Sequence, residues 1–338
     1  MPIVLVYTDP HINLKRKQHY TQASLAAREA WCHEKLEQIL GPSEVAICLG
    51  DFFDKESNDE AAILRGVKIA EQTTHLMAGN HDHPNREGAA SSLQVLKELF
   101  PERVILEPRT VRIGKTLFCF APHQMTQELY DASIKELEGE AGPFGGFRIL
   151  CLHCSYDSPF ELPESALNLT EARARELLST FHQIWIGHEH KARDIFDGRI
   201  RVIGSLFPTS FEELGKGEHR YLWYNTETGD TVSEYVDPAY LKLPASACRA
   251  LPTHTVHYYE LEDDLPHGEA QRLVVDLFNA GAFAVKLRQK ALQELPKAEA
   301  VSQESILSLP GIIRGALQQE NPALVSLWDD YAKGEATC

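Results

Sequence analysis

The sequence predicts an α/β fold for residues 1–240 and a smaller α+β region for residues 245–338. Short runs of β-branched and aromatic residues alternate with longer helical stretches through the first domain, as in a central sheet covered by helices. After Tyr235 the pattern changes, because prolines interrupt the chain at close intervals. These prolines are Pro238, Pro244, Pro252 and Pro266. We therefore expect one large domain and a small appended region.

The elements of the first domain follow from residue spacing and from the residues that end helices. A strand is expected over residues 3–7, and an amphipathic helix over residues 24–40 is ended by Gly41 and Pro42. Further strands are expected over residues 45–49, 75–78, 111–113, 116–120, 147–152, 184–186, 200–203, 221–224 and 231–235. Further helices are expected over residues 58–72, 93–100 and 170–181.

The region 245–338 is expected to hold a strand over residues 255–261 and a helix over residues 269–280. Residues 306–333 are expected to be mostly helical, divided by Pro310 and Pro322. Apolar residues in that last stretch recur at helical spacing. They indicate either an internal core, which is the simpler interpretation, or a face that binds a partner.

The composition is that of a soluble globular protein, with 43% hydrophobic and 24% charged residues. There is no run of about 18 apolar residues, so no membrane span is expected, and the first residues do not resemble a secretion signal. Seven scattered cysteines favour a reducing cytoplasm over a disulfide framework. Cys151 and Cys154 form a CxxC in an expected strand, and we interpret them as buried thiols rather than a redox pair.

Five polar clusters stand out because each directly follows an expected strand. They are Asp9-Pro10-His11, Gly50-Asp51-Phe52-Phe53-Asp54, Gly79-Asn80-His81-Asp82, His153 and Gly187-His188-Glu189-His190. In α/β folds such loops meet at the carboxyl edge of the sheet, where the chemistry is placed. Carboxylates together with neutral imidazoles suit Mn²⁺, Fe²⁺ or Zn²⁺, whereas Mg²⁺ prefers fewer histidines. The clusters therefore predict a metal site at that edge.

The ordered motifs DxH, GDxxD, GNHD, H and GHxH, over residues 9–190, resemble those of the calcineurin-like metallophosphoesterase superfamily. The resemblance implies a four-layer αββα sandwich with a binuclear metal centre at its edge. Carried over motif by motif, it implies a first metal held by Asp9, His11, Asp51 and His190. It implies a second metal held by Asp51, which bridges the two, and by Asn80, His153 and His188. It also implies that His81 is the general acid and that Asp54 orients it.

Two adjacent divalent cations can neutralise phosphoryl oxygens and support in-line displacement. The departing alkoxide then needs a proton, which a protonated imidazole can deliver near pH 7. The expected cofactors are therefore two divalent metal ions, with Mn²⁺ expected first and Fe²⁺, Zn²⁺ or Mg²⁺ as alternatives.

The sequence also indicates a branch of this superfamily. Protein Ser/Thr phosphatases show GDxVDRG and GNHE, whereas this chain has GDFFDKE and GNHD. Residues 202–216, VIGSLFPTSFEELGK, resemble the segment that follows GHxH in DNA exonucleases of the SbcD type. This second resemblance covers about residues 1–235. It implies a Mn²⁺-dependent nuclease that acts on DNA in repair or recombination, with an SbcC-like coiled-coil ATPase as partner and residues 245–338 as a cap and partner-binding region. Related nucleases are often dimers, so a homodimer is a further expectation.

The residues themselves give mixed support for DNA as the substrate. Basic side chains near the first and last motifs are candidate phosphate contacts: Lys15, Arg16, Lys17, Arg193, Arg199 and Arg201. Four phenylalanines are interpreted either as stacking on a strand end or as core: Phe52, Phe53, Phe207 and Phe211. The net charge of −16 opposes DNA binding, because phosphate contacts normally draw on lysine and arginine.

Two other functions stay open from the sequence. A small-molecule phosphodiesterase or phosphatase, acting on nucleotides or cyclic nucleotides, would agree better with the acidic net charge. A scaffold whose metal site no longer catalyses is the other alternative. The intact set of metal-binding and acid residues argues against that scaffold.

Overall fold

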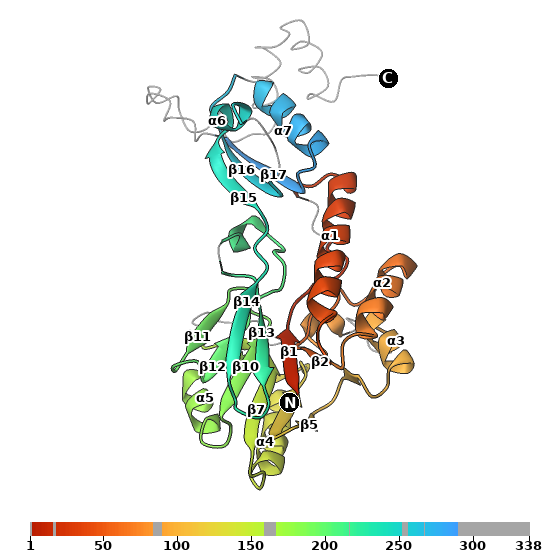
Figure 1. The fold of residues 1–338 in the computed structure, drawn as a ribbon, viewed down its shortest axis with the longest axis vertical. Helices are drawn as coiled ribbons and strands as arrows, with labels where there is room; N and C mark the ends of the chain where they lie inside the picture. Colours follow the sequence, from red (N-terminus) through yellow and green to blue (C-terminus); the bar gives the residue numbers. More distant parts are fainter. Residues whose placement is uncertain are drawn as a thin grey trace, which may run out of the picture. The chain divides into compact units, whose positions relative to one another are not determined.

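The structure, a computed structural model, describes residues 2–15, 18–83, 90–158, 167–215, 217–251, 256–266 and 268–289. Residues 1–288 form one compact unit, and the chain divides after Arg288. The elements below belong to the first unit (Figure 1). The helical stretch expected over residues 306–333, with its apolar stripe, lies outside the described residues.

The first of two large sheets has six strands in the order β14-β13-β1-β2-β3-β4. The strands are β1 (Ile3–Tyr7), β2 (Val45–Cys48), β3 (His75–Met77), β4 (Val104–Ile105), β13 (Arg220–Asn225) and β14 (Thr231–Tyr235). The four N-terminal strands are mutually parallel, and β13 joins β1 in antiparallel register. A strand from residue 220 onwards therefore completes a sheet that starts at residue 3.

The second large sheet also has six strands, in the order β11-β12-β10-β7-β6-β5. The strands are β5 (Arg109–Ile113), β6 (Thr116–Ala121), β7 (Phe147–His153), β10 (Gln183–Gly187), β11 (Arg193–Ile195) and β12 (Ile200–Val202). Its four central strands are parallel, and β5 and β11 pair with them in antiparallel register at the two edges. Every residue of β6 is buried, as expected where both faces of a parallel strand are covered.

Three hydrophobic layers hold these sheets and their helices together. Between the sheets, side chains such as Val4, Phe118 and Trp185 form one fully buried layer. Outside the first sheet lie α1 (Gln22–Leu40), α2 (Glu60–Ala70) and α3 (Ser92–Leu99), and outside the second lie α4 (Gln127–Ala141) and α5 (Glu171–Leu177). The predicted four-layer αββα sandwich is confirmed.

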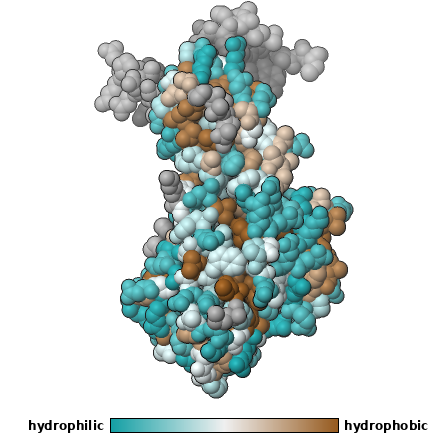
Figure 2. Space-filling model, in the orientation of Figure 1, coloured by the Kyte–Doolittle hydropathy of each residue, from teal (hydrophilic) through white to brown (hydrophobic). Residues whose placement is uncertain are grey.

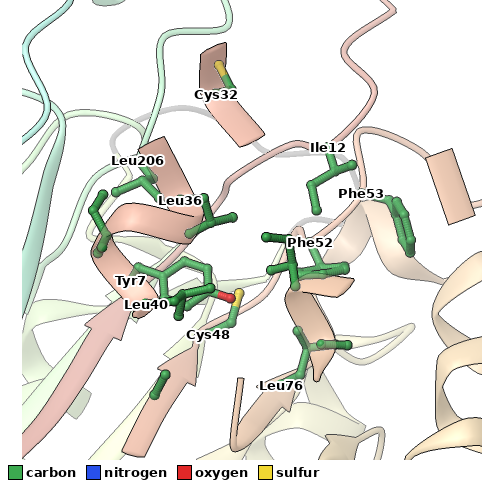
Figure 3. Close-up of a cluster of buried hydrophobic side chains, with 14 of the residues drawn as sticks. Tyr7, Ile12, Cys32, Leu36, Leu40, Cys48, Phe52, Phe53, Leu76 and Leu206 are labelled. Carbon is green, nitrogen blue, oxygen red and sulfur yellow. The ribbon is translucent and has the colours of Figure 1, made fainter. Parts of the chain in front are cut away.

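The layer under α1 shows how the first helix is fixed to the sheet. Figure 3 shows Leu36 and Leu40 of α1 beside Tyr7 of β1 and Cys48 of β2. The helix begins at the N-cap Thr21, whose side chain accepts a hydrogen bond from the Ser24 N–H. Its apolar stripe therefore packs against the outer face of the sheet that carries the first two motifs.

Helix α4 was not predicted from the sequence. Its residues QELYDASIKELEGEA are mostly polar, which hides the helical period of the buried side chains Tyr130, Ile134 and Leu137. The helix becomes recognisable only where those three side chains pack on the second sheet.

A small third sheet follows the sandwich, in the order β15-β16-β17. It consists of β15 (Tyr240–Pro244), β16 (Tyr258–Asp263) and β17 (Ala284–Gln289), accompanied by α6 (Ala245–Arg249) and α7 (Glu269–Asn279). The strand and the helix expected near residues 258 and 269 are confirmed, whereas β15, α6 and β17 were not foreseen. Because β15 begins at Tyr240, the small sheet starts slightly before the predicted region 245–338.

The cysteines in the described part of the chain are buried and unpaired. Burial raises the pKa of the Cys154 thiol to about 12, and it also raises the pKa of Cys151. Such thiols are unreactive, in agreement with their interpretation as core residues. Among the described residues, every helix is too short or too polar to cross a bilayer.

The surface is mostly hydrophilic in the view of Figure 2, with hydrophobic patches toward α2 and α3. Leu64 of α2 and Leu99 of α3 are among the exposed large hydrophobic residues.

Two helical glycines give a test of the packing between the sheet and its helices. A Cβ added at Gly66 of α2 would lie 2.5 Å from the buried Phe53 ring, whereas a Cβ at Gly139 of α4 would meet nothing within 4 Å. We expect Gly66→Ala to lower the free energy of unfolding by about 1–3 kcal/mol through overpacking. Gly139→Ala should instead raise it by about 0.5–1 kcal/mol through helix propensity. Urea unfolding of both variants measures the difference, and equal stabilisation by both would contradict the described packing of Phe53.

Candidate metal centre

The five polar clusters lie at the carboxyl ends of five strands drawn from both large sheets. The strands are β1, β2 and β3 of the first sheet and β7 and β10 of the second. The clusters come together because the two sheets stack with these ends at the same edge, and their side chains then meet across the sandwich.

The chain leaves β1, β2 and β10 through tight turns that need unusual backbone angles. Asp9, His11, Asp51 and His188 all have positive φ, between 44° and 80°. Such angles are uncommon for residues with a side chain and gather at functional sites, where the surrounding structure holds them. Gly50 has a φ of 109°, and a Cβ there would lie 2.3 Å from the His153 ring. The turns thus bring backbone and ligand side chains closer than ordinary residues permit.

The first group of candidate ligands consists of Asp9, His11 and His190. The Nε2 atoms of the two histidines are 3.1 Å apart, and each lies 3.8 Å from Oδ1 of Asp9. That oxygen is buried and accepts no hydrogen bond, whereas Oδ2 accepts the His188 N–H and the Thr8 hydroxyl. A buried carboxylate oxygen without a donor, facing two imidazole nitrogens, has the geometry of a cation site.

The second group consists of Asp51, His153 and His188, with Asn80 between the histidines. Oδ1 of Asn80 lies 3.0 Å from His153 Nε2 and 2.8 Å from His188 Nδ1. Oδ1 of Asp51 lies 3.2 Å from His153 Nε2. Two imidazole nitrogens and two oxygens therefore lie close enough together to bind one cation.

Asp51 contacts both groups with different oxygens. Oδ1 faces His153, and Oδ2 lies 4.0 Å from His11 Nε2. The carboxylate is buried, and His153 and His11 lower its pKa against the raising effect of burial. One carboxylate pointing at two ligand groups is the arrangement expected of a bridging ligand.

His81 lies beside this carboxylate but is open to solvent. Its Nε2 is 3.9 Å from Oδ2 of Asp51, and its side chain is 41% exposed. Its Nδ1 donates to the main-chain carbonyl of Asp54 at 2.6 Å. Burial lowers the pKa of His81, but the Asp51 carboxylate and the Asp54 carbonyl more than offset this and raise it above 6.5. His81 also forms a possible ligand group with His11 and Asp51, so the geometry alone allows His81 to be a metal ligand.

Asp54 is placed differently from the sequence-based expectation. Its carbonyl, rather than its carboxylate, orients His81. The carboxylate lies 3.3 Å from His11 Nδ1 without the alignment of a hydrogen bond, and it accepts the Lys15 N–H. The side chain of Asp54 therefore acts on the first ligand group and on the following loop.

The chemistry of the donor atoms tests whether these residues fit divalent cations. Burial lowers the pKa of His153, but the Asp51 carboxylate raises it to about 9, so this position favours positive charge. His153 donates its Nδ1–H to the Leu49 carbonyl at 2.7 Å, which leaves Nε2 free to bind a metal. Together with the unpartnered Asp9 oxygen, these features give the two candidate groups the donor chemistry that divalent cations prefer.

The candidate phosphate contacts are mostly engaged within the protein. Arg193 pairs with Glu189, Arg201 pairs with Asp194 at 2.6 Å, and Arg199 donates to the Leu178 carbonyl at 2.6 Å. Lys15 lies beside Asp54, and its Nζ donates to the Ser57 carbonyl at 3.2 Å. Arg16 and Lys17 lie outside the described residues.

The four phenylalanines proposed as stacking residues are buried. Their exposed fractions lie between 0% and 8%, and they belong to hydrophobic clusters. They are Phe52, Phe53, Phe207 and Phe211. The stacking interpretation is therefore wrong for these residues, and the core interpretation is confirmed.

Two carboxylates near the centre received no role in the sequence-based prediction. Asp82, the last residue of GNHD, accepts the N–H groups of Gly79, Phe52 and Phe53 and so ties two motif loops together. Glu213 lies 3.1 Å from Nδ1 of His190. Burial raises the pKa of Glu213, but His190 and neighbouring donors lower it to about 2. The only sequence signal for either was its place in a motif.

Comparison with known proteins agrees with this geometry. A family model described as calcineurin-like phosphoesterase matches residues 3–192. No curated protein matches the chain significantly. Among solved structures, the chain resembles a "putative 5'-nucleotidase" from Staphylococcus aureus in complex with alpha-ketoglutarate, with 13% identity and a TM-score of 0.40. The alignment covers 82% of this chain and 58% of that one, so the chain spans less than two thirds of its length. A similarity this low says nothing about substrate.

The position of Asp51 between the two ligand groups makes a metal-binding prediction. Asp51→Asn should bind fewer than one cation per chain where the unaltered chain binds about two, because each site loses its shared anion. Asp131→Asn, which removes an exposed carboxylate of α4, serves as the control. Elemental analysis of both variants after dialysis against Mn²⁺ gives the result. Full metal content in Asp51→Asn would contradict the bridging arrangement.

Metal removal should also affect stability, with a defined pH dependence. Chelation should lower the melting temperature, since a cation at 100 times its Kd stabilises the fold by about 2.7 kcal/mol. The metals must displace protons from His153 and His190: against the lowering effect of burial, Asp51 raises the pKa of His153 to about 9, and Glu213 and Asp9 raise the pKa of His190 to about 9. Apparent affinity for Mn²⁺ should therefore increase as the pH rises from 6 toward about 9. Calorimetric titrations in buffers of different ionisation enthalpy would detect the released protons, and binding without proton release would contradict this account.

Proposed function

The chain belongs to the calcineurin-like phosphoesterase family, and on that premise we propose that it hydrolyses phosphodiester bonds, with DNA as its substrate. The observation that supports hydrolysis most directly is Asp51, shared between two convergent groups of oxygen and imidazole ligands. We propose Asp9, His11, Asp51 and His190 as ligands of one cation and Asp51, Asn80, His153 and His188 as ligands of the other. When bound, such a pair supplies Lewis acidity and a template for in-line displacement.

We propose His81 as the group that protonates the leaving alkoxide. Its Nδ1 is held by the Asp54 carbonyl, so Nε2 is directed toward Asp51 and the candidate centre. The exposed position of the ring lets a polymeric substrate reach it. The carboxylate of Asp51 favours the protonated ring, as a general acid at neutral pH requires.

The support for DNA comes from the segment that resembles SbcD-type nucleases, residues 202–216. In the structure this segment lies against the last metal-site histidine: the Ser205 N–H donates to the His190 carbonyl at 3.2 Å, and the Thr209 hydroxyl lies 3.3 Å from its ring. The segment 202–216, which is more specific to SbcD-type nucleases than the metal motifs are, thus lies beside the candidate centre. An SbcC-like ATPase partner and a homodimer belong to the same proposal, and a partner could supply the basic surface that this acidic chain needs.

A second candidate is a phosphodiesterase or phosphatase acting on nucleotides or cyclic nucleotides. It is favoured by the engagement of Arg193, Arg199 and Arg201 within the protein, since a DNA-binding face normally presents such side chains to phosphates. The net charge of −16 points the same way. This candidate predicts comparable or faster turnover of small substrates.

A substrate panel separates the two candidates. The Mn²⁺-loaded chain, alone and with a coiled-coil ATPase of the SbcC type, is given linear duplex DNA, single-stranded DNA, mononucleotides and cyclic nucleotides. We expect release of nucleotides from DNA, and the Asp51→Asn variant controls for contaminating nucleases. Turnover of mononucleotides or cyclic nucleotides with DNA left intact would contradict the DNA proposal and support the second candidate.

The role of His81 can be separated from metal binding by the choice of leaving group. His81→Asn should lower turnover of DNA about 10²–10⁴-fold, because the alkoxide leaves without a proton. Bis(p-nitrophenyl) phosphate releases a stable anion and should lose less than about 10-fold. Metal content should stay unchanged. Equal losses on both substrates, or loss of a metal, would mean that His81 is a ligand; His33→Asn on α1 is the control.

A further inference from the structure

The loop 205–213 surrounds the outer side of the His190 ring, away from the metal-facing nitrogen. Nε2 of His190 points toward Asp9 and His11. Its other nitrogen, Nδ1, lies 3.1 Å from Oε1 of Glu213. The ring is therefore held between the candidate metal position and one carboxylate.

The Glu213 carboxylate is itself fixed. Oε1 accepts the hydroxyls of Thr209 and Ser210 at 2.8 Å each, and Oε2 accepts the Thr209 N–H at 2.8 Å. The side chain is only 13% exposed. On the other side of the loop, Nε2 of His219 donates to the Glu213 carbonyl at 3.0 Å. A carboxylate with this many donors cannot rotate away from His190, so it sets the ring orientation and keeps the proton on Nδ1.

A buried arginine connects this loop to the small C-terminal sheet. Arg28 of α1 is 1% exposed, and its Nη2 donates to the Pro208 carbonyl at 2.7 Å, one residue before Thr209. Its Nε donates to the hydroxyl of Tyr258 on β16 at 3.2 Å, and its charge is paired with Glu29 at 2.6 Å. A buried cation keeps its partners, because a buried charge without a partner is strongly destabilising.

We propose that Glu213 is a positioning residue that fixes His190 for metal binding, and that Arg28 anchors the loop carrying Glu213 to the small C-terminal sheet. The proposal rests on the candidate metal centre but not on the identity of the substrate. In this proposal, the serine and threonine side chains of residues 205–213 hold the Glu213 carboxylate in place, and β16 helps to position the candidate centre. Phe211 in the same loop packs on the Tyr258 ring, with centroids 6.1 Å apart, which reinforces that connection.

The first test measures Mn²⁺ affinity rather than activity. Glu213→Gln keeps the shape of the side chain but removes its charge, and it should weaken Mn²⁺ binding about 10–100-fold in calorimetric titration. The neighbouring Glu212→Gln is a matched control, because Glu212 is 65% exposed and pairs with Lys286 instead. Unchanged affinity in Glu213→Gln, or an equal loss in Glu212→Gln, would overturn the role of Glu213.

A second readout separates positioning from folding. Co²⁺ substituted into Glu213→Gln should give an altered visible spectrum, since the ring of one ligand is no longer held, while the metal-free variant unfolds close to the unaltered metal-free chain. If Glu213→Gln does not fold, Glu213→Asp replaces it, because aspartate keeps the negative charge. Glu213→Asp should bind Mn²⁺ more tightly than Glu213→Ala, which has no carboxylate. Equal Mn²⁺ affinity in these two variants, both folded, would contradict the proposal.

The role of Arg28 is tested by Arg28→Met, which preserves side-chain length and removes the hydrogen bond to Pro208. Arg28→Met should lower Mn²⁺ affinity by a smaller factor than Glu213→Gln does. Tyr258→Phe should lower Mn²⁺ affinity by a smaller factor than Arg28→Met does. Unchanged affinity in Arg28→Met would remove the small sheet from the proposal. Normal Mn²⁺ binding by the unaltered chain without hydrolysis of any phosphodiester would instead contradict the proposed function and leave this inference intact.

Discussion

The candidate centre depends on two buried carboxylates, Asp9 and Asp51, that face imidazole nitrogens from several strands. Asp9 and Asp51 are almost completely excluded from water, and one Asp9 oxygen has no donor. Burying a charge without a partner is costly, so the site needs cations. Two divalent ions would pair with both carboxylates and would satisfy the free Asp9 oxygen as well.

The sandwich supplies the rigidity that such a site requires. Each candidate ligand lies at the end of a strand or in the turn that follows it, and each strand is fixed by neighbours in its sheet and by buried layers on both faces. This support holds Asp9, His11, Asp51 and His188 in backbone conformations that they rarely adopt. Asp82 strengthens the arrangement by joining the loops of the second and third motifs. The fold therefore holds the candidate ligands in fixed positions at one edge of the sandwich.

The surroundings of the centre bear on the substrate. His81 is accessible and the family chemistry is phosphoester hydrolysis, yet the arginines near the last motif are occupied by internal partners. A chain with a net charge of −16 that acts on DNA would need cations, or a partner, to bring the polymer to its centre. The link from His190 through Glu213 and Arg28 to Tyr258 would let the small C-terminal sheet influence the centre.

Local patterns in the sequence predicted the α/β fold and the polar clusters at its edge, and the resemblance of those clusters to a known family implied the sandwich and the candidate ligands. Strand and helix periods are visible in the first domain, and five clusters of Asp, Asn and His follow strands at fixed spacing. Helix α4 was missed because its apolar period is hidden among acidic residues, and β15 and β17 were missed as well. Only the tertiary structure decided that Asp54 orients His81 through its carbonyl, that Phe52 and Phe211 are core residues, and that Glu213 faces His190. Those features depend on contacts between segments far apart in the chain, and residue spacing along the sequence does not encode which side chain meets which.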